Sequence, residues 1–191
     1  MPKNESAHYQ ADQFGVPYTF LYPVGWNVRE LGENGNANTL ITGPRNQADT
    51  FSAGLTVSAS RSVTQTPAEA AAEWLGKFTP SRFTIQTRGP LPTTVAGRPA
   101  VEIEITHWMP LPLHAKRWQR TVIRQHDIFF QRGDQLYQVN YMATEEHYEA
   151  CLAAFRNLVA SFSFPEKSAH RATYRPATAA AARRCRSRAR W

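Results

Sequence analysis

The chain has 191 residues, of which 42% are hydrophobic and 19% are charged, a balance that suits one folded globular domain and excludes wholesale disorder. No run of about 20 continuous apolar residues is present, which argues against a membrane-spanning helix in this sequence. Two cysteines are too few for a disulfide framework or a four-thiolate metal site.

The formal net charge of +7 lies at the C-terminal end of the chain. Residues 166–191 hold eight basic residues and one acidic residue, and residues 1–165 hold 14 of each kind. The part that we expect to fold is therefore neutral, and long-range attraction to an anionic partner is expected only from the tail.

Three segments are predicted. Residues 1–13 are polar and are expected to be disordered, residues 14–164 form the folded domain, and residues 165–191 form a basic, disordered tail. Binding of this tail to nucleic acid or to an anionic membrane surface stays open as an alternative. Because residues 1–10 lack the apolar core of a signal peptide, we expect a cytoplasmic protein.

Short strands separated by turns open the folded domain. Residues 18–22 alternate aromatic and other side chains, and further short strands are predicted at residues 28–31, 39–42 and 55–60. We expect Trp26, directly after a proline–glycine turn, to fold back over the edge of the sheet and to help close the core.

A helix is predicted over residues 66–78. Thr66 and Glu69 have the spacing of a capping box, and Pro67 occupies the first helical position. Apolar side chains follow at helical spacing, among them Trp74 and Phe78.

Residues 83–143 have the pattern of an antiparallel meander. Strands are predicted at residues 83–86, 101–106, 116–131 and 135–143, with a loop at Pro110 and Pro112 and a hairpin turn at residues 132–134. The second of these strands alternates strictly, with valine and isoleucine facing inward and glutamate and threonine facing outward.

A second helix is predicted over residues 144–162. Thr144 precedes two glutamates in the first turn, and an apolar stripe that includes Cys151 continues from there. We expect Cys151 to be a small buried hydrophobic residue. The fold class is therefore α+β: an antiparallel β-sheet meander flanked by two or more helices.

Four motifs in order resemble those of the PsbP-like family. They are residues 20–26 (FLYPVGW), 97–100 (GRPA) and 133–137 (GDQLY), followed by the second helix, which ends in Ser161 and Phe162. The resemblance covers about residues 14–164. It implies the αβα sandwich shared by PsbP-like proteins, DcrB-related bacterial proteins and Mog proteins.

The resemblance also implies a function without turnover. It favours an accessory, assembly or chaperone-adaptor protein that binds a protein partner, and an extrinsic protein associated with photosystem II is the alternative within the same class. Family members are commonly exported or lipid-anchored, in contrast to the location expected above. No metal ligand of the family can be matched to a residue here.

The chain shows no motif for catalysis or for a cofactor. Its six histidines do not stand at metal-ligand spacing, although His107, His114 and His126 could converge on neighbouring strands. A nucleophile elbow, a P-loop and a dinucleotide-binding glycine motif are absent. We therefore predict no enzyme activity, no cofactor, no metal site and no catalytic residue.

Residues 107–126 contain no acid and several cationic and aromatic side chains. On a strand, five of them share one face because their numbers have equal parity: Lys116, Trp118, Arg120, Arg124 and His126. We predict that this stripe binds an anionic partner through ion pairs and cation–π contacts. The alternative is that Glu102 and Glu104 pair with Arg120 and Arg124 across the sheet.

Overall fold

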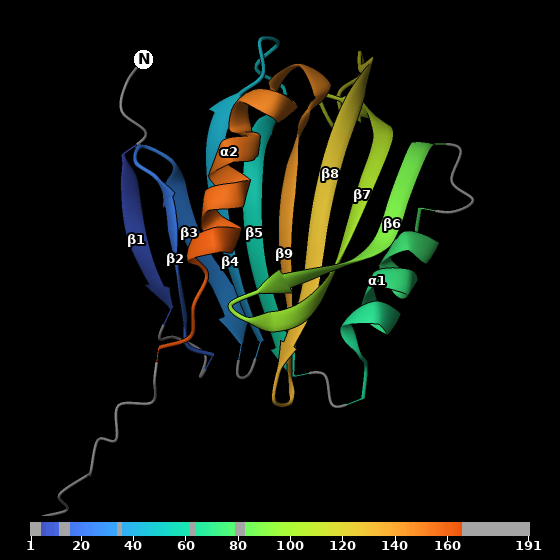
Figure 1. The fold of residues 1–191 in the computed structure, drawn as a ribbon. Coiled ribbons are helices and arrows are strands. Elements are labelled where there is room, and N and C mark those ends of the chain that lie inside the picture. Colours follow the sequence, from blue (N-terminus) through green and yellow to red (C-terminus); the bar gives the residue numbers. More distant parts are fainter. Residues whose placement is uncertain (1–4, 12–15, 34–35, 62–63, 79–82, 166–191) are drawn as a thin grey trace, which may run out of the picture.

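A computed structural model describes residues 5–11, 16–33, 36–61, 64–78 and 83–165. The predicted basic tail lies outside the described residues, apart from Pro165. Figure 1 shows a large twisted sheet, a small two-stranded sheet beside it, and two helices.

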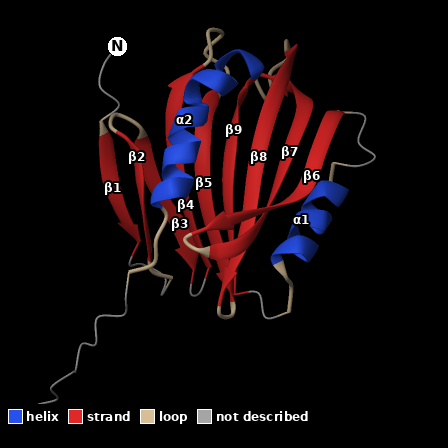
Figure 2. Cartoon of the chain, in the orientation of Figure 1, coloured by secondary structure: helices blue, strands red, loops and turns tan. Residues whose placement is uncertain are grey.

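The large sheet is antiparallel throughout and has the strand order β3-β4-β5-β9-β8-β7-β6. The small sheet pairs β1 with β2, and Figure 2 distinguishes the strands from the helices. The predicted α+β class and the meander are therefore confirmed. In chain order the elements are β1 (Ser6–Ala11), β2 (Tyr18–Pro23), β3 (Asn27–Glu33), β4 (Asn36–Arg45), β5 (Ser52–Arg61), α1 (Pro67–Gly76), β6 (Thr84–Val95), β7 (Arg98–Leu111), β8 (Gln119–Arg132), β9 (Gln135–Thr144) and α2 (Glu145–Ser161).

The two helices cover opposite faces of the large sheet. The neighbouring residues Phe129 and Phe130 of β8 belong to different cores, as expected when successive strand residues point to opposite faces. Phe130 lies in the core beneath α2 and the small sheet, whereas Phe129 packs with Ile103 and Ala71 beneath α1. This arrangement is the αβα sandwich predicted above.

The start of α1 has the geometry predicted from its sequence. The Glu69 backbone N–H donates to Thr66 Oγ1 at 3.2 Å, and the Thr66 backbone N–H donates to Glu69 Oε2 at 2.8 Å. This reciprocal capping satisfies two N–H groups that a helix leaves without partners.

A buried carboxylate on β8 connects α1 to the sheet. Asp127 is fully buried, and its two oxygens accept hydrogen bonds from Trp74 Nε1 (3.2 Å), Gln125 Nε2 (2.7 Å), Gln138 Nε2 (2.8 Å) and Asn140 Nδ2 (2.8 Å). Burial raises the pKa of Asp127, and the four donors oppose that rise. No pattern in the sequence predicted a role for Asp127.

Three boundaries predicted from the sequence are wrong. Residues 6–11 are not disordered, because they form β1 and pair with β2 along their whole length. Pro110 lies inside β7 rather than in a loop, and β6 continues to Val95 instead of ending at Gln86. Prolines are tolerated in β6 because it is the edge strand of the sheet.

Trp26 packs against the core, as predicted, but stays half-buried. Its indole lies directly against Gly43 of β4, where a Cβ atom would approach the ring to 2.6 Å. The ring therefore closes one margin of the core and leaves its other side open.

Candidate binding surface

The predicted cationic stripe is divided by the start of β8. The hairpin register pairs Leu111 with Gln119, so Lys116 and Trp118 lie in the connection before β8, and the prediction that the strand begins at Lys116 is wrong. Arg120, Arg124 and His126 do share one face of β8, and this is the face that α2 covers in part.

The inner half of the stripe is engaged with α2. The Arg124 guanidinium lies 3.8 Å from the centre of the Tyr148 ring, and its Nη1 is 2.8 Å from Glu149 Oε1. The His126 ring packs 4.8 Å from the Phe155 ring. These side chains fasten the helix to the sheet and are therefore poor candidates for partner contacts.

The pairing of glutamates with arginines expected as an alternative does not form. Glu102 Oε2 lies 3.4 Å from His126 Nε2, and Glu104 Oε1 lies 3.3 Å from Arg88 Nη1. The register explains the difference, because Arg120 stands opposite Pro110 and is too far along β8 to reach either glutamate.

The outer half of the stripe borders an apolar hollow, which we call the hairpin patch because it lies where β7 turns into β8. The hollow has a volume of about 520 Å³. Trp118, at 57% exposure, is one of its walls. Its lining consists of aromatic, proline, histidine and alanine residues: Phe83, Trp108, Pro110, Pro112, His114, Ala115 and Trp118.

The rings of the hairpin patch are held in defined positions. Phe83 and Trp108 meet edge to face with their centroids 4.7 Å apart, a favourable geometry for aromatic pairs. The Arg120 guanidinium lies over the Trp108 ring, 4.6 Å from its centroid.

Three cationic side chains adjoin the lining residues: Lys116 and Arg117 stand between Ala115 and Trp118 in the chain, and Arg120 lies over the Trp108 ring. We call these three residues the rim of the hollow. Lys116, Arg117 and Arg120 are exposed, and none of the three has an ion-pair partner among the residues that the structure describes. Leu113, in the same connection, is 52% exposed. The patch therefore combines an apolar hollow with a positive rim.

Comparison with known proteins gives structural matches only. No protein-family model matches the sequence, and no curated protein matches it. The crystal structure of LpqN from Mycobacterium tuberculosis, which is involved in cell envelope biogenesis, is 12% identical with a TM-score of 0.53, covering 84% of this chain and 91% of LpqN. The chain has a PsbP-like fold.

Two further solved structures are similar over most of their length. CyanoP, the cyanobacterial PsbP of Synechocystis sp. PCC 6803, is 13% identical with a TM-score of 0.48, covering 84% of this chain and 93% of CyanoP. PA94 of Pseudomonas aeruginosa, a protein of unknown function described as a putative regulator, is 13% identical with a TM-score of 0.46, covering 80% of this chain and 92% of PA94. The resemblance predicted from the sequence is confirmed at the level of the fold by the architecture of the chain and by the match to LpqN.

In this PsbP-like fold the described residues contain no group of three histidine, cysteine, aspartate or glutamate side chains placed to hold a metal ion. Nor does any described helix have the length and apolar character needed to span a membrane. Of the three histidines that could converge on neighbouring strands, His107 is buried against Phe78 with its ring centroid 5.4 Å away, and burial lowers its pKa.

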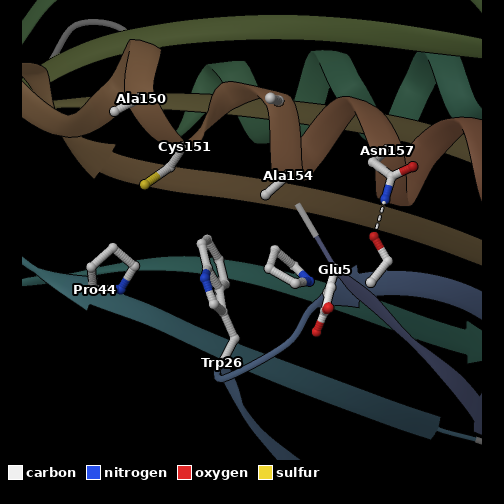
Figure 3. Close-up of a pocket in the computed structure, with 10 residues that line it drawn as sticks. Glu5, Trp26, Pro44, Ala150, Cys151, Ala154 and Asn157 are labelled. Atoms are coloured by element: carbon white, nitrogen blue, oxygen red, sulfur yellow. Dashed lines mark hydrogen bonds between the residues drawn. The ribbon is translucent and has the colours of Figure 1, made fainter. Parts of the chain in front are cut away.

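A second hollow lies on the other side of α2 (Figure 3). It measures about 590 Å³, and its walls are the alanine-rich side of α2, the Trp26 indole, and two prolines. A hydrogen bond from Asn157 Nδ2 to Ser6 Oγ, 3.1 Å long, lies at one end. Among the residues that the structure describes, no cationic side chain lines this groove, so it does not match the predicted stripe.

Cys151 lines the groove, and we expect its thiol to react slowly. Burial raises the pKa of the Cys151 thiol, so less of it is thiolate at pH 8 than in a free cysteine with a pKa of about 8.5. The measurement uses a Cys185→Ser variant of the full chain, in which Cys151 is the one thiol. Its reaction rate with Ellman's reagent should therefore keep rising above about pH 9, where that of glutathione levels off. A rate that levels off together with that of glutathione would contradict the buried position.

Proposed function

We propose that this chain is a non-catalytic accessory protein, of the assembly or chaperone-adaptor type, that binds a protein partner through the hairpin patch. The observation that carries the proposal is the exposed Trp118 beside an apolar hollow with three cations on its rim. Exposed aromatic and arginine side chains around a hollow are the usual anchors of protein interfaces.

The titratable groups with shifted pKa values support a role without turnover. Burial raises the pKa of Tyr18 and of Tyr137 to about 12, and both tyrosines lie in the core. Asp127, whose pKa is also raised, has both oxygens occupied by four structural donors. These shifts stem from packing and do not gather acid and base groups around a hollow.

A test of the proposal removes the anchors of the patch while leaving the fold intact. A Trp118→Ser/Arg120→Ser variant of the full chain is used to capture proteins from a lysate of the cells that naturally produce this protein. We expect the amount of each specific partner captured to fall about tenfold or more below the amount captured by the wild type. The melting temperature should change by about 2 °C or less, because substitutions at exposed positions alter stability little.

The matched control is Arg61→Ser. Arg61 is exposed and lies at the opposite end of the sheet, beside the β8–β9 hairpin. It should leave partner recovery unchanged, as measured by quantitative mass spectrometry of the captured proteins. Equal recovery by the double variant and the wild type would place the binding site elsewhere.

The Arg-rich tail favours a second candidate function, binding to nucleic acid or to an anionic surface, because it carries the whole net charge of +7. Truncation after Pro165 separates the two candidates. A protein that binds through its tail loses retention on heparin when truncated, whereas one that binds through the hairpin patch keeps its protein partners.

A further inference from the structure

We infer that the partner segment bound by the hairpin patch is a short acidic stretch of polypeptide that places an aromatic side chain in the hollow. This inference rests on the proposed function and adds the chemistry of the partner. It follows from the shape of the hollow, from the unpaired charges on its rim and from the neutral charge of the rest of the domain.

The hollow is suited to an aromatic anchor. Its walls include two tryptophans, a phenylalanine and two prolines, and its volume of about 520 Å³ accommodates a large side chain together with part of the adjoining backbone. Aromatic side chains pair favourably with such rings in edge-to-face or offset geometry. Extended segments that contain proline dock on similar aromatic-lined grooves.

The rim selects for negative charge. Two other arginines on this side of the sheet are already neutralised, Arg88 by Glu104 and Arg124 by Glu149. Lys116, Arg117 and Arg120, by contrast, form no ion pair among the described residues, although Arg120 also borders a separate hollow that Glu145 and Glu146 line. Because Arg120 lies over Trp108, its guanidinium is held beside the hollow and can form a bidentate pair with a carboxylate.

The surroundings favour polypeptide over nucleic acid. Residues 1–165 carry equal numbers of basic and acidic residues, so their zero net charge gives no overall attraction to a phosphate backbone. Leu113, 52% exposed in the same connection as Trp118, would be removed from water by an apolar partner surface, which is favourable. Three cations around one apolar hollow therefore match a few carboxylates that flank one ring.

The test measures the binding of labelled peptides to the purified full chain by fluorescence anisotropy. The probe is a short peptide with a Glu-Pro-Phe-Glu core. Its matched controls replace both glutamates with lysine, or the phenylalanine with serine, and a labelled single-stranded oligonucleotide serves as the polyanion control. We expect the probe to bind about tenfold more tightly than either control peptide, and to bind more weakly as salt is added.

Variants locate the binding. Trp118→Ser should abolish binding of the probe and Arg120→Ser should weaken it about tenfold, whereas Arg124→Ser should have little effect because α2 already holds that side chain. Equal binding of the lysine peptide, tighter binding of the oligonucleotide that is lost in Trp118→Ser, or undiminished binding of the probe by Trp118→Ser would each overturn the inference.

The peptide test and the capture experiment fail separately. If no peptide binds but the double variant still loses its cellular partners, the acidic-aromatic chemistry is wrong and the proposed function stands. If the double variant also keeps all its partners, both are wrong.

Discussion

Phe162→Ala should lower the free energy of unfolding by about 3–5 kcal/mol, the range for truncating a buried aromatic residue. Phe162 directly follows α2 and is only 3% exposed. Its ring lies 5.7 Å from that of Tyr18, 5.2 Å from that of Phe130 and 6.2 Å from that of Tyr137. It therefore joins the small sheet to the large one, and its loss leaves a cavity between them.

The backbone directly after Phe162 is hydrogen-bonded to β2 of the small sheet. Ser163 and Thr19 exchange two hydrogen bonds, with N···O distances of 2.8 and 2.9 Å. Phe162→Ala should therefore also raise the rate of amide hydrogen exchange in β1 and β2. Phe162→Leu, which conserves most of the volume, should lose less than about 1.5 kcal/mol. Leu113→Ala, at an exposed position, should change stability by about 0.5 kcal/mol or less. A loss below about 1 kcal/mol for Phe162→Ala in urea denaturation would show that the two sheets are held together elsewhere.

Local signals in the sequence predicted the elements that form by themselves or with their neighbours. The capping box at Thr66 places the start of α1, and the strict alternation of residues 101–106 gives the face of β7 that packs beneath α1. Hairpin neighbours are close in sequence, so the meander from β6 to β9 follows from turn residues and alternation.

Elements that depend on distant partners could not be predicted in this way. In β1 only Tyr9 and Ala11 are buried, so its own residues give a weak strand signal. Its order comes from pairing with β2 and from the Tyr9 hydroxyl, which donates to Glu30 Oε1 at 2.7 Å. Asp127 similarly depends on donors from α1, β8 and β9 that meet only in the folded chain.

The sequence predicted only part of the candidate site, because the remaining contacts also depend on elements that are distant in the sequence. Parity placed Arg120, Arg124 and His126 on one face, but only the packing of α2 shows that Arg124 and His126 are engaged. Pro110 and Pro112 were predicted to mark a loop, and Phe83 was predicted only to begin a strand. A pair of prolines between two tryptophans was the available signal, and the structure places both prolines in the wall of the hollow.

Gly89 lies at an irregularity of β6, beyond the predicted end of that strand at Gln86. Gly89→Ala should lower the free energy of unfolding by about 2–5 kcal/mol. The residue has φ of +99°, a conformation that costs a residue with a side chain about 1–2 kcal/mol. A Cβ atom there would also lie 2.6 Å from the carbonyl oxygen of Glu102 and 3.2 Å from Ile103 Cα. Both atoms belong to the backbone of β7, so the clash requires a strand to move, which adds about 1–3 kcal/mol.

Gly97→Ala separates these two effects. Gly97 turns the chain between β6 and β7 with φ of +71°, and nothing lies within 4 Å of the position of a Cβ atom there. It should lose only the conformational part, about 1–2 kcal/mol. Urea denaturation of both variants measures the difference, which reports how closely β6 approaches β7 at the bend. Equal losses for the two glycines would show that β7 yields to a Cβ atom at position 89 without resistance.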